Sequence, residues 1–190
     1  LFFGALLTLG SSGTVANLVG GVLLLFSRLF KVGDRIRVGE IEGDVLEIEL
    51  LLTRVRTPKN ELVSIPNGAL LGGHVVNFSA RAATDGLILH TSVTIGYDTP
   101  WRQVHELLLA AARKTDGLLA DPAPFVHQTA LSDFYVEYEL NARTRSANAK
   151  AELYSRLHQN IQDEFNRAGV QIMSPHYEAD PPQPKLAPVK

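Results

Sequence analysis

Residues Leu1 to Ser27 carry no charged side chain, and Arg28 and Lys31 follow them at once. A helix that crosses a bilayer needs roughly 20 apolar residues, so an uncharged run of this length predicts a membrane-spanning helix. Glycine, hydroxyl and amide side chains interrupt the run, and a plain hydrophobic anchor would lack them. Small residues let membrane helices pack closely, and polar groups at that depth need partners. We therefore predict a helix that packs and bends, with a straight anchor as the alternative.

Gly13 divides this segment into two unlike halves. Residues 1–12 are apolar around most of the helix, whereas residues 15–26 place an apolar band beside small and polar residues. Helices kink at glycine–serine pairs, and the stretch Gly-Ser-Ser-Gly at 10–13 supplies two of them. We predict that the helix bends near Gly13 and that its second half lies closer to the membrane surface.

Other small and polar residues of the segment have predicted roles as well. Gly20 and Gly21 are the next candidates for a hinge after Gly13. Gly4 and Thr8 form a pair of small residues one turn apart, which suits close packing between membrane helices. The amide of Asn17 is a further candidate for a packing contact.

The remaining chain shows the periodicities of two folded domains. Residues 31–82 contain short runs in which apolar and polar residues alternate, which predicts a small all-β barrel. Residues 83–176 follow the order strand, helix, strand, strand, helix, strand, which is the ferredoxin-like α+β pattern. Residues 177–190 are rich in proline and predict a flexible tail. With the helix at 1–30, the chain divides into four parts.

Charge and composition exclude several classes of function. The net charge is −2, so no basic surplus favours a nucleic-acid partner. The absence of cysteine rules out disulfides and thiolate metal sites. The six histidines share no ligand spacing, and no phosphate-binding loop, nucleophile elbow or zinc helix is present. We predict a protein that is not an enzyme, with no catalytic residue, metal or cofactor.

The flanks of the uncharged run predict its orientation. Arg28, Lys31, Arg35 and Arg37 follow it closely, and positive residues beside a span favour the cytoplasmic side. We therefore expect the soluble domains to be cytoplasmic. The chain begins inside a hydrophobic run without an initiator methionine, so we expect it to be a fragment whose earlier spans are missing.

Three phrases occur in a fixed order along the chain. They are ANLVGGVLL at 16–24, FKVGD at 30–34, and VSIPNG at 63–68 with VNFS at 76–79. Near the end, GVQIMSP at 169–175 adds a fourth. Together these phrases closely resemble the mechanosensitive channels of small conductance, the MscS family, over nearly the whole chain.

The resemblance implies a fold and a function. Members have a pore-lining transmembrane helix, a cytoplasmic Sm-like β domain and an α/β domain, and seven subunits enclose a vestibule. We therefore expect a membrane α-helix followed by an all-β Sm-like barrel and an α+β ferredoxin-like domain. The implied assembly is a homoheptamer in the cell (inner) membrane, multi-pass in the full-length protein. Membrane tension opens it on hypo-osmotic shock, and ions and small solutes leave through it. The expected partners are further copies of the chain, membrane lipids and permeating ions.

The resemblance also implies the residues of the pore. Leu9 falls at a leucine of the family's hydrophobic constriction, and Gly13 falls at the hinge after the pore helix. Phe2, Ala5 and Ser12 share a helix face with Leu9, so these four residues are the expected pore lining. Ala5 stands where a second constriction leucine is common, so the seal rests on Leu9 with Phe2.

A second class of function stays open. A membrane-tethered Sm-like module that binds RNA or protein, or that acts as a scaffold, would have the same element order. Against RNA, the β segment lacks aromatic residues on which bases could stack, since Phe78 is its only aromatic after Phe30.

The constriction yields a first prediction. Leu9→Ser replaces the large apolar side chain with a hydroxyl, so water should fill the narrow pore and lower the barrier to ions. We expect the variant to open at lower membrane tension in patch recordings and to slow the growth of cells that express it. An unchanged opening threshold would remove Leu9 from the gate.

Overall fold

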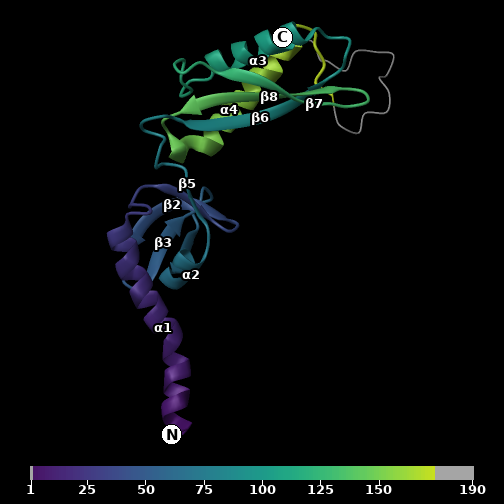
Figure 1. Ribbon diagram of the computed structural model, residues 1–190. Helices are drawn as coiled ribbons and strands as arrows, with labels where there is room; N and C mark the ends of the chain where they lie inside the picture. The colour runs from purple at the N-terminus through teal and green to yellow at the C-terminus, as the bar shows by residue number, and fades with distance from the viewer. Residues whose placement is uncertain (1, 174–190) are drawn as a thin grey trace. The chain divides into compact units, whose positions relative to one another are not determined.

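The computed structural model describes residues 2–173, with side chains from Gly13 onward. The chain forms two compact units, drawn in Figure 1. The first consists of Leu1–Leu87 together with Ser146–Asn148, and the second takes Ile88–Arg145 and the chain from Ala149 on. The proline-rich tail predicted at 177–190 lies outside the described residues.

The uncharged N-terminal segment forms one helix, α1, from Phe2 to Ser27. Gly13 lies inside this uninterrupted helix, so the predicted bend corresponds to no helix end and stays a prediction. The helix stops before Arg28, which has a positive φ of 52°. Among the helices of the described part of the chain, none combines the length and the hydropathy that a membrane span requires.

The first unit contains a sheet of five antiparallel strands in the order β4-β3-β2-β1-β5. The strands are β1 (Arg35–Val38), β2 (Ile41–Ile48), β3 (Leu52–Arg56), β4 (Leu62–Pro66) and β5 (Val75–Asn77). A short helix, α2 (Asn67–Gly72), follows β4 directly. The pair Asn67-Gly68 after proline is typical of a turn. In the structure this pair instead begins a helix.

The core of the first unit receives one side chain from each of four strands. These buried residues are Ile36, Val45, Val55 and Ile65. Leu24 of α1 is 2% exposed and belongs to the same cluster. The end of α1 is therefore part of the β domain's hydrophobic core, and the periodicity of the helix alone did not reveal this.

The second unit has the order β6-α3-β7-β8-α4, as the hydrophobic pattern predicts. The elements are β6 (Leu87–Ile95), α3 (Trp101–Lys114), β7 (Phe125–Leu131), β8 (Val136–Thr144), a 3-10 turn (Ala147–Ala149) and α4 (Lys150–Arg167). The sheet has the strand order β6-β8-β7. The expected closing strand is not formed. Residues 170–173 have no regular secondary structure. The Met173 N–H nevertheless donates to the Thr94 carbonyl at 2.8 Å, beside β6.

Two helices supply most of the second core. On α4 the buried residues recur every four positions, which gives one apolar stripe. They are Leu153, Leu157, Ile161 and Phe165. Leu157, Ile161 and Phe165, with Val104 and Leu108 of α3, pack with Tyr138 and Leu140 of β8. The apolar stripes of both helices are therefore the faces that pack against the sheet.

His105 lies on α3 among aromatic rings. Its ring centroid is 5.1 Å from that of Trp101 and 5.8 Å from that of Tyr138, with both pairs edge to face. The Nε2 atom is buried and has no hydrogen-bond partner among residues 2–173. Burial lowers the pKa of His105 below its ordinary value, because the imidazolium would lose water without gaining a partner.

This environment yields a pH prediction. The unfolded state binds the His105 proton more tightly than the folded state, so stability should fall as the pH drops through the unfolded pKa of about 6.5. We expect the midpoint of thermal unfolding to decrease between about pH 7.5 and 5.5. His105→Phe keeps a ring and removes the titration, so its midpoint should depend less on pH. Fluorescence of Trp101, the one tryptophan, reports unfolding of this unit.

His127→Phe is the matched control, because His127 is exposed on β7. This variant should keep the pH dependence of the parent. Glu164 contributes in a lower pH range, since hydrogen bonds from Lys114 and Arg167 lower its pKa. An identical slope in His105→Phe and the parent would contradict the assignment.

Candidate functional site

The backbone of α1 lies directly against the β domain at two glycines. A Cβ on Gly21 would lie 2.1 Å from the Leu50 carbonyl oxygen, in the β2–β3 loop. A Cβ on Gly20 would lie 2.8 Å from the Asn67 carbonyl carbon, at the start of α2. Real Cβ atoms do not approach backbone this closely, so any larger residue would push the helix away. The two glycines therefore allow α1 to dock here.

Asn67 is the polar centre of the surface on which α1 docks. Its side chain is fully buried, and its Nδ2 donates to the Glu49 carbonyl at 2.8 Å and the Leu50 carbonyl at 3.1 Å. The Thr53 hydroxyl donates to its Oδ1 at 2.9 Å, and its own N–H donates to the Leu51 carbonyl at 3.0 Å. Buried polar groups are costly unless satisfied, and these bonds fix the β2–β3 loop against α2.

Asn17 joins α1 to the first turn of α2. The first N–H groups of a helix lack partners inside that helix, and α2 has no side-chain cap of its own. The Gly68 N–H donates to the Oδ1 of Asn17 at 2.9 Å. Asn17 therefore serves α2 as a cap supplied from another helix. A Cβ on Gly68 would lie 2.9 Å from the same oxygen, so a larger residue here would displace the Asn17 side chain.

The other side of the second half of α1 is apolar and exposed in the described chain. Its exposed large hydrophobic residues are Val15, Leu18, Val19, Val22, Leu23, Leu25 and Phe26. Contiguous apolar surface of this kind marks contact with protein or with lipid rather than with water. The helix thus presents one face to the β domain and leaves another to a different environment.

Several predicted site residues lie where the structure describes only the backbone. They are Phe2, Gly4, Ala5, Thr8, Leu9 and Ser12, all within α1. Their predicted pore-lining and packing roles stay predictions. Gly13 is exposed, and a Cβ there would meet no atom of the described residues within 4 Å. The hinge roles of Gly13, Gly20 and Gly21 also stay predictions, although the last two lie at the docking contact.

Sequence analysis missed the partners of the docked helix. Asn67 and Gly68 belong to a phrase that marked the family, but their pattern suggested a turn. Nothing in the sequence marks Leu50 as a contact of α1. The sequence indicates a docking face only on α1 itself, where Asn17, Gly20 and Gly21 fall at i, i+3 and i+4 on one helix face. No group of His, Asp and Glu among the described residues could hold a metal ion.

Two protein-family profiles match the chain, one for each unit. The profile described as "Mechanosensitive ion channel, beta-domain" matches residues 13–80. The profile described as "Mechanosensitive ion channel MscS, C-terminal" matches residues 89–172. The docking contact of α1 lies within the first match.

The chain is also similar to curated proteins. An uncharacterised MscS family protein of Synechocystis sp. is 30% identical over 138 residues, which are 73% of this chain and 46% of the relative. The mechanosensitive channel MscK of Escherichia coli is 30% identical over 129 residues, 68% of this chain and 11% of MscK. The channel MscMJ of Methanocaldococcus jannaschii is 25% identical over 177 residues, 92% of this chain and 50% of MscMJ. The chain thus spans half or less of these relatives.

Solved structures share its fold. The closed-state crystal structure of Helicobacter pylori MscS has a TM-score of 0.77 at 17% identity, over 96% of this chain and 71% of that chain. The cryo-EM structure of Arabidopsis thaliana MSL1 has a TM-score of 0.66 at 20% identity, over 91% of this chain and 63% of that chain.

The docking contact yields a stability prediction. Gly21→Ala forces a methyl group against the Leu50 carbonyl, so we expect a loss of about 1–3 kcal/mol in the free energy of unfolding of the first unit. Gly13→Ala is the matched control on the same helix. Its methyl meets nothing, and alanine favours a helix over glycine by about 1 kcal/mol. Denaturant unfolding followed by circular dichroism would measure both. Equal stability of the two variants would contradict the close approach.

Proposed function

Because the chain belongs to the MscS family of mechanosensitive ion channels, we propose that it forms one subunit of a homo-oligomeric channel that membrane tension opens. One observation carries this proposal. An uncharged helix is docked onto a β domain through Gly20, Gly21 and Asn17, with its opposite face apolar and exposed. Such a contact lets a force on a membrane helix reach a domain outside the membrane.

In the proposed channel α1 is the pore-lining transmembrane helix, and its first half lines the constriction. Phe2, Ala5, Leu9 and Ser12 follow one another at spacings of three and four residues, which places them along one helix face. A ring of Leu9 side chains in a narrow pore repels water, so ions meet a desolvation barrier. Opening the ring would release ions and small solutes on hypo-osmotic shock. No catalytic step and no cofactor enter this function.

Tension favours the conformation that occupies more membrane area, and the gate needs an element with two stable arrangements. We assign that role to α1 on either side of Gly13. The second half is held by the β domain, whereas Gly4 and Thr8 let the first half pack against neighbouring helices. A bend at Gly13 would then change the width of the pore, while the half of α1 that is docked on the β domain stays in place.

The domains outside the membrane complete the proposal. We assign the five-stranded sheet to an Sm-like barrel and the second unit to a ferredoxin-like domain, with residues 170–173 at the place of its fourth strand. Arg28 and Lys31 directly after α1 support a cytoplasmic position for both domains. The proposed assembly is a homoheptamer in the inner membrane, multi-pass in the full-length protein and in contact with lipid.

Recording from the full-length protein in liposomes tests this function. Under suction we expect stepwise currents that begin at a reproducible tension, because the open state occupies more area than the closed one. Liposomes without protein, pulled to the same tension, are the control. Native mass spectrometry in mild detergent should show seven subunits.

Two outcomes would overturn the proposal. One is the absence of suction-activated current up to the tension at which the patch breaks. The other is a strictly monomeric species across concentrations with the helix present. Salt-dependent binding of RNA, together with either outcome, would instead favour a membrane-tethered binding module.

A further inference from the structure

Arg35 is buried on the face of the sheet where arginine would ordinarily be exposed. Neighbouring side chains of a strand point to opposite faces, and Ile36 points into the core of the first unit. Arg35 therefore lies on the outer face of β1. It is nevertheless only 4% exposed, whereas Arg37 on the same strand is exposed. Something other than the sheet must cover it.

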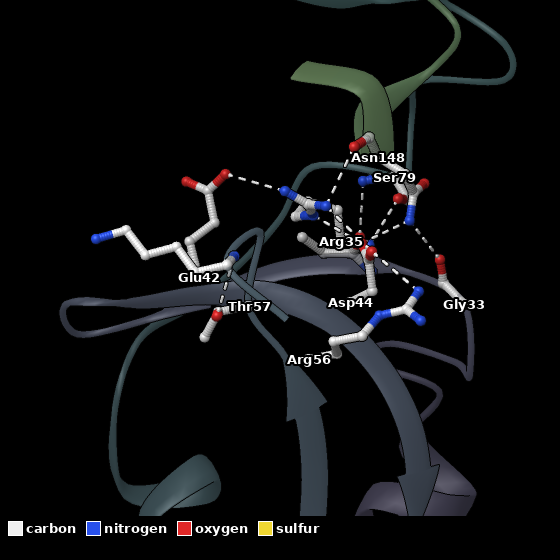
Figure 2. A network of polar contacts seen from close by, with 10 residues as sticks. Gly33, Arg35, Glu42, Asp44, Arg56, Thr57, Ser79 and Asn148 are labelled. Carbon is white, nitrogen blue, oxygen red and sulfur yellow. Dashed lines mark hydrogen bonds and ion pairs between the residues drawn. The ribbon is translucent and has the colours of Figure 1, made fainter. Parts of the chain in front are cut away.

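Asp44 neutralises the buried guanidinium. Arg35 and Asp44 are opposite each other in β1 and β2. The Arg35 Nε donates to Asp44 Oδ1 at 2.6 Å and its Nη2 to Oδ2 at 3.1 Å, a two-pronged pair. Glu42 lies 3.8 Å from Arg35, and Arg56 lies 3.9 Å from Asp44. Figure 2 shows these charges around Arg35, with Asn148 reaching them from a different segment of the chain.

The segment Ser146–Asn148 is what covers Arg35. The Arg35 Nη2 donates to the Asn148 carbonyl at 3.1 Å. The Asn148 Nδ2 donates to Asp44 Oδ1 at 2.6 Å and to the Gly33 carbonyl at 3.2 Å. Ala147 beside it is 2% exposed. Asn148 therefore contacts both members of the ion pair, with an acceptor for the cation and a donor for the anion.

This segment belongs to the first unit although the chain on both sides of it belongs to the second. Arg145 precedes it after the end of β8, and Ala149 follows it at the start of α4. The chain already passes from the first unit to the second after Leu87. The contact of Asn148 with Arg35 and Asp44 therefore lies within the first unit.

We propose that Arg35 and Asp44 form a docking site for the chain's own turn at Asn148, and that this contact is a latch with a bound and a released state. In the bound state Asn148 covers the ion pair. In the released state the turn leaves, and Arg35 and Asp44 stay paired on the sheet. The latch is a conformational device built into the fold.

The composition of the site makes release feasible. Removing one member of a buried ion pair leaves an unpaired charge, which is strongly unfavourable. Here the departing group is neutral, and the two charges remain together and gain water, as an ordinary surface ion pair does. The contacts of the turn include three hydrogen bonds of Asn148 and the buried side chain of Ala147, which is small and apolar.

Hydrogen–deuterium exchange on the full-length protein in detergent tests the latch. Asn148→Ala removes both side-chain donors, so we expect backbone exchange across residues 144–150 and 33–35 to rise by roughly tenfold. Asn166→Ala is the matched control, because Asn166 is an exposed asparagine of α4. It should leave both segments unchanged. An unchanged thermal transition in far-UV circular dichroism, which reports both units, would show that Asn148→Ala remains folded.

An exchange of partners separates docking from a general loss of structure. Asn148→Asp places a carboxylate against Asp44 and should release the turn at least as strongly as Asn148→Ala. Asp44→Asn in the same chain restores one donor, one acceptor and one negative charge beside Arg35. The double variant should therefore recover most of the protection that Asn148→Asp loses. Additive effects of the two substitutions would overturn the latch.

The functional consequence rests on the proposed channel function, and the two can fail separately. With the latch released, β1 and β2 lose the cover of Asn148 and can rearrange within the first unit, so channels with Asn148→Ala should open at lower tension in patches. Unchanged exchange in Asn148→Ala overturns the latch whatever the currents show. Increased exchange in a protein whose parent carries no suction-activated current would leave the latch standing and defeat the channel.

Discussion

The close approach of α1 to the β domain at Gly21 is the contact on which the rest of the first unit depends. Without a Cβ at this position, the helix backbone reaches the Leu50 carbonyl and the buried Asn67. That approach brings Asn17 within reach of the Gly68 N–H and lets Leu24 enter the hydrophobic core. The absence of one methyl group thus permits a polar contact and an apolar one. Both hold a helix whose exposed large side chains between Val15 and Phe26 are hydrophobic.

The sheet against which α1 packs also contacts a second part of the chain, which is distant from it in sequence. Leu24 joins the core on one face, while Asn148 covers Arg35 on the other. The chemistry of the two contacts differs. The core contact depends on apolar burial and is costly to open, whereas the Asn148 contact consists mainly of hydrogen bonds to an ion pair that persists without it. The same β domain therefore has a permanent attachment and a releasable one.

Much of the fold could be predicted from periodicity, and part of the candidate site could be as well. The apolar stripe of α4 and the strands of both sheets follow from local patterns, and the sequence alone marks Asn17, Gly20 and Gly21 as small or polar residues on one face of α1. The start of α2 at Asn67 was not predicted, because Pro-Asn-Gly is typical of a turn and the helix there depends on tertiary contacts. The closing strand beside β6 was predicted but is not formed, although the Met173 N–H still donates to the Thr94 carbonyl.

By itself the sequence determined the uncharged helix, the two-domain order, the balance of charge and the family. These properties depend on composition and on residues that are near one another in the chain. The tertiary structure alone decided that Asn17 binds Gly68, 51 positions away, and that Arg35 binds Asn148, 113 positions away. An asparagine in a helix and an arginine in a strand are both compatible with full exposure to water. Which partner covers each of them depends on the path of the chain through space, and local periodicity carries no information about that path.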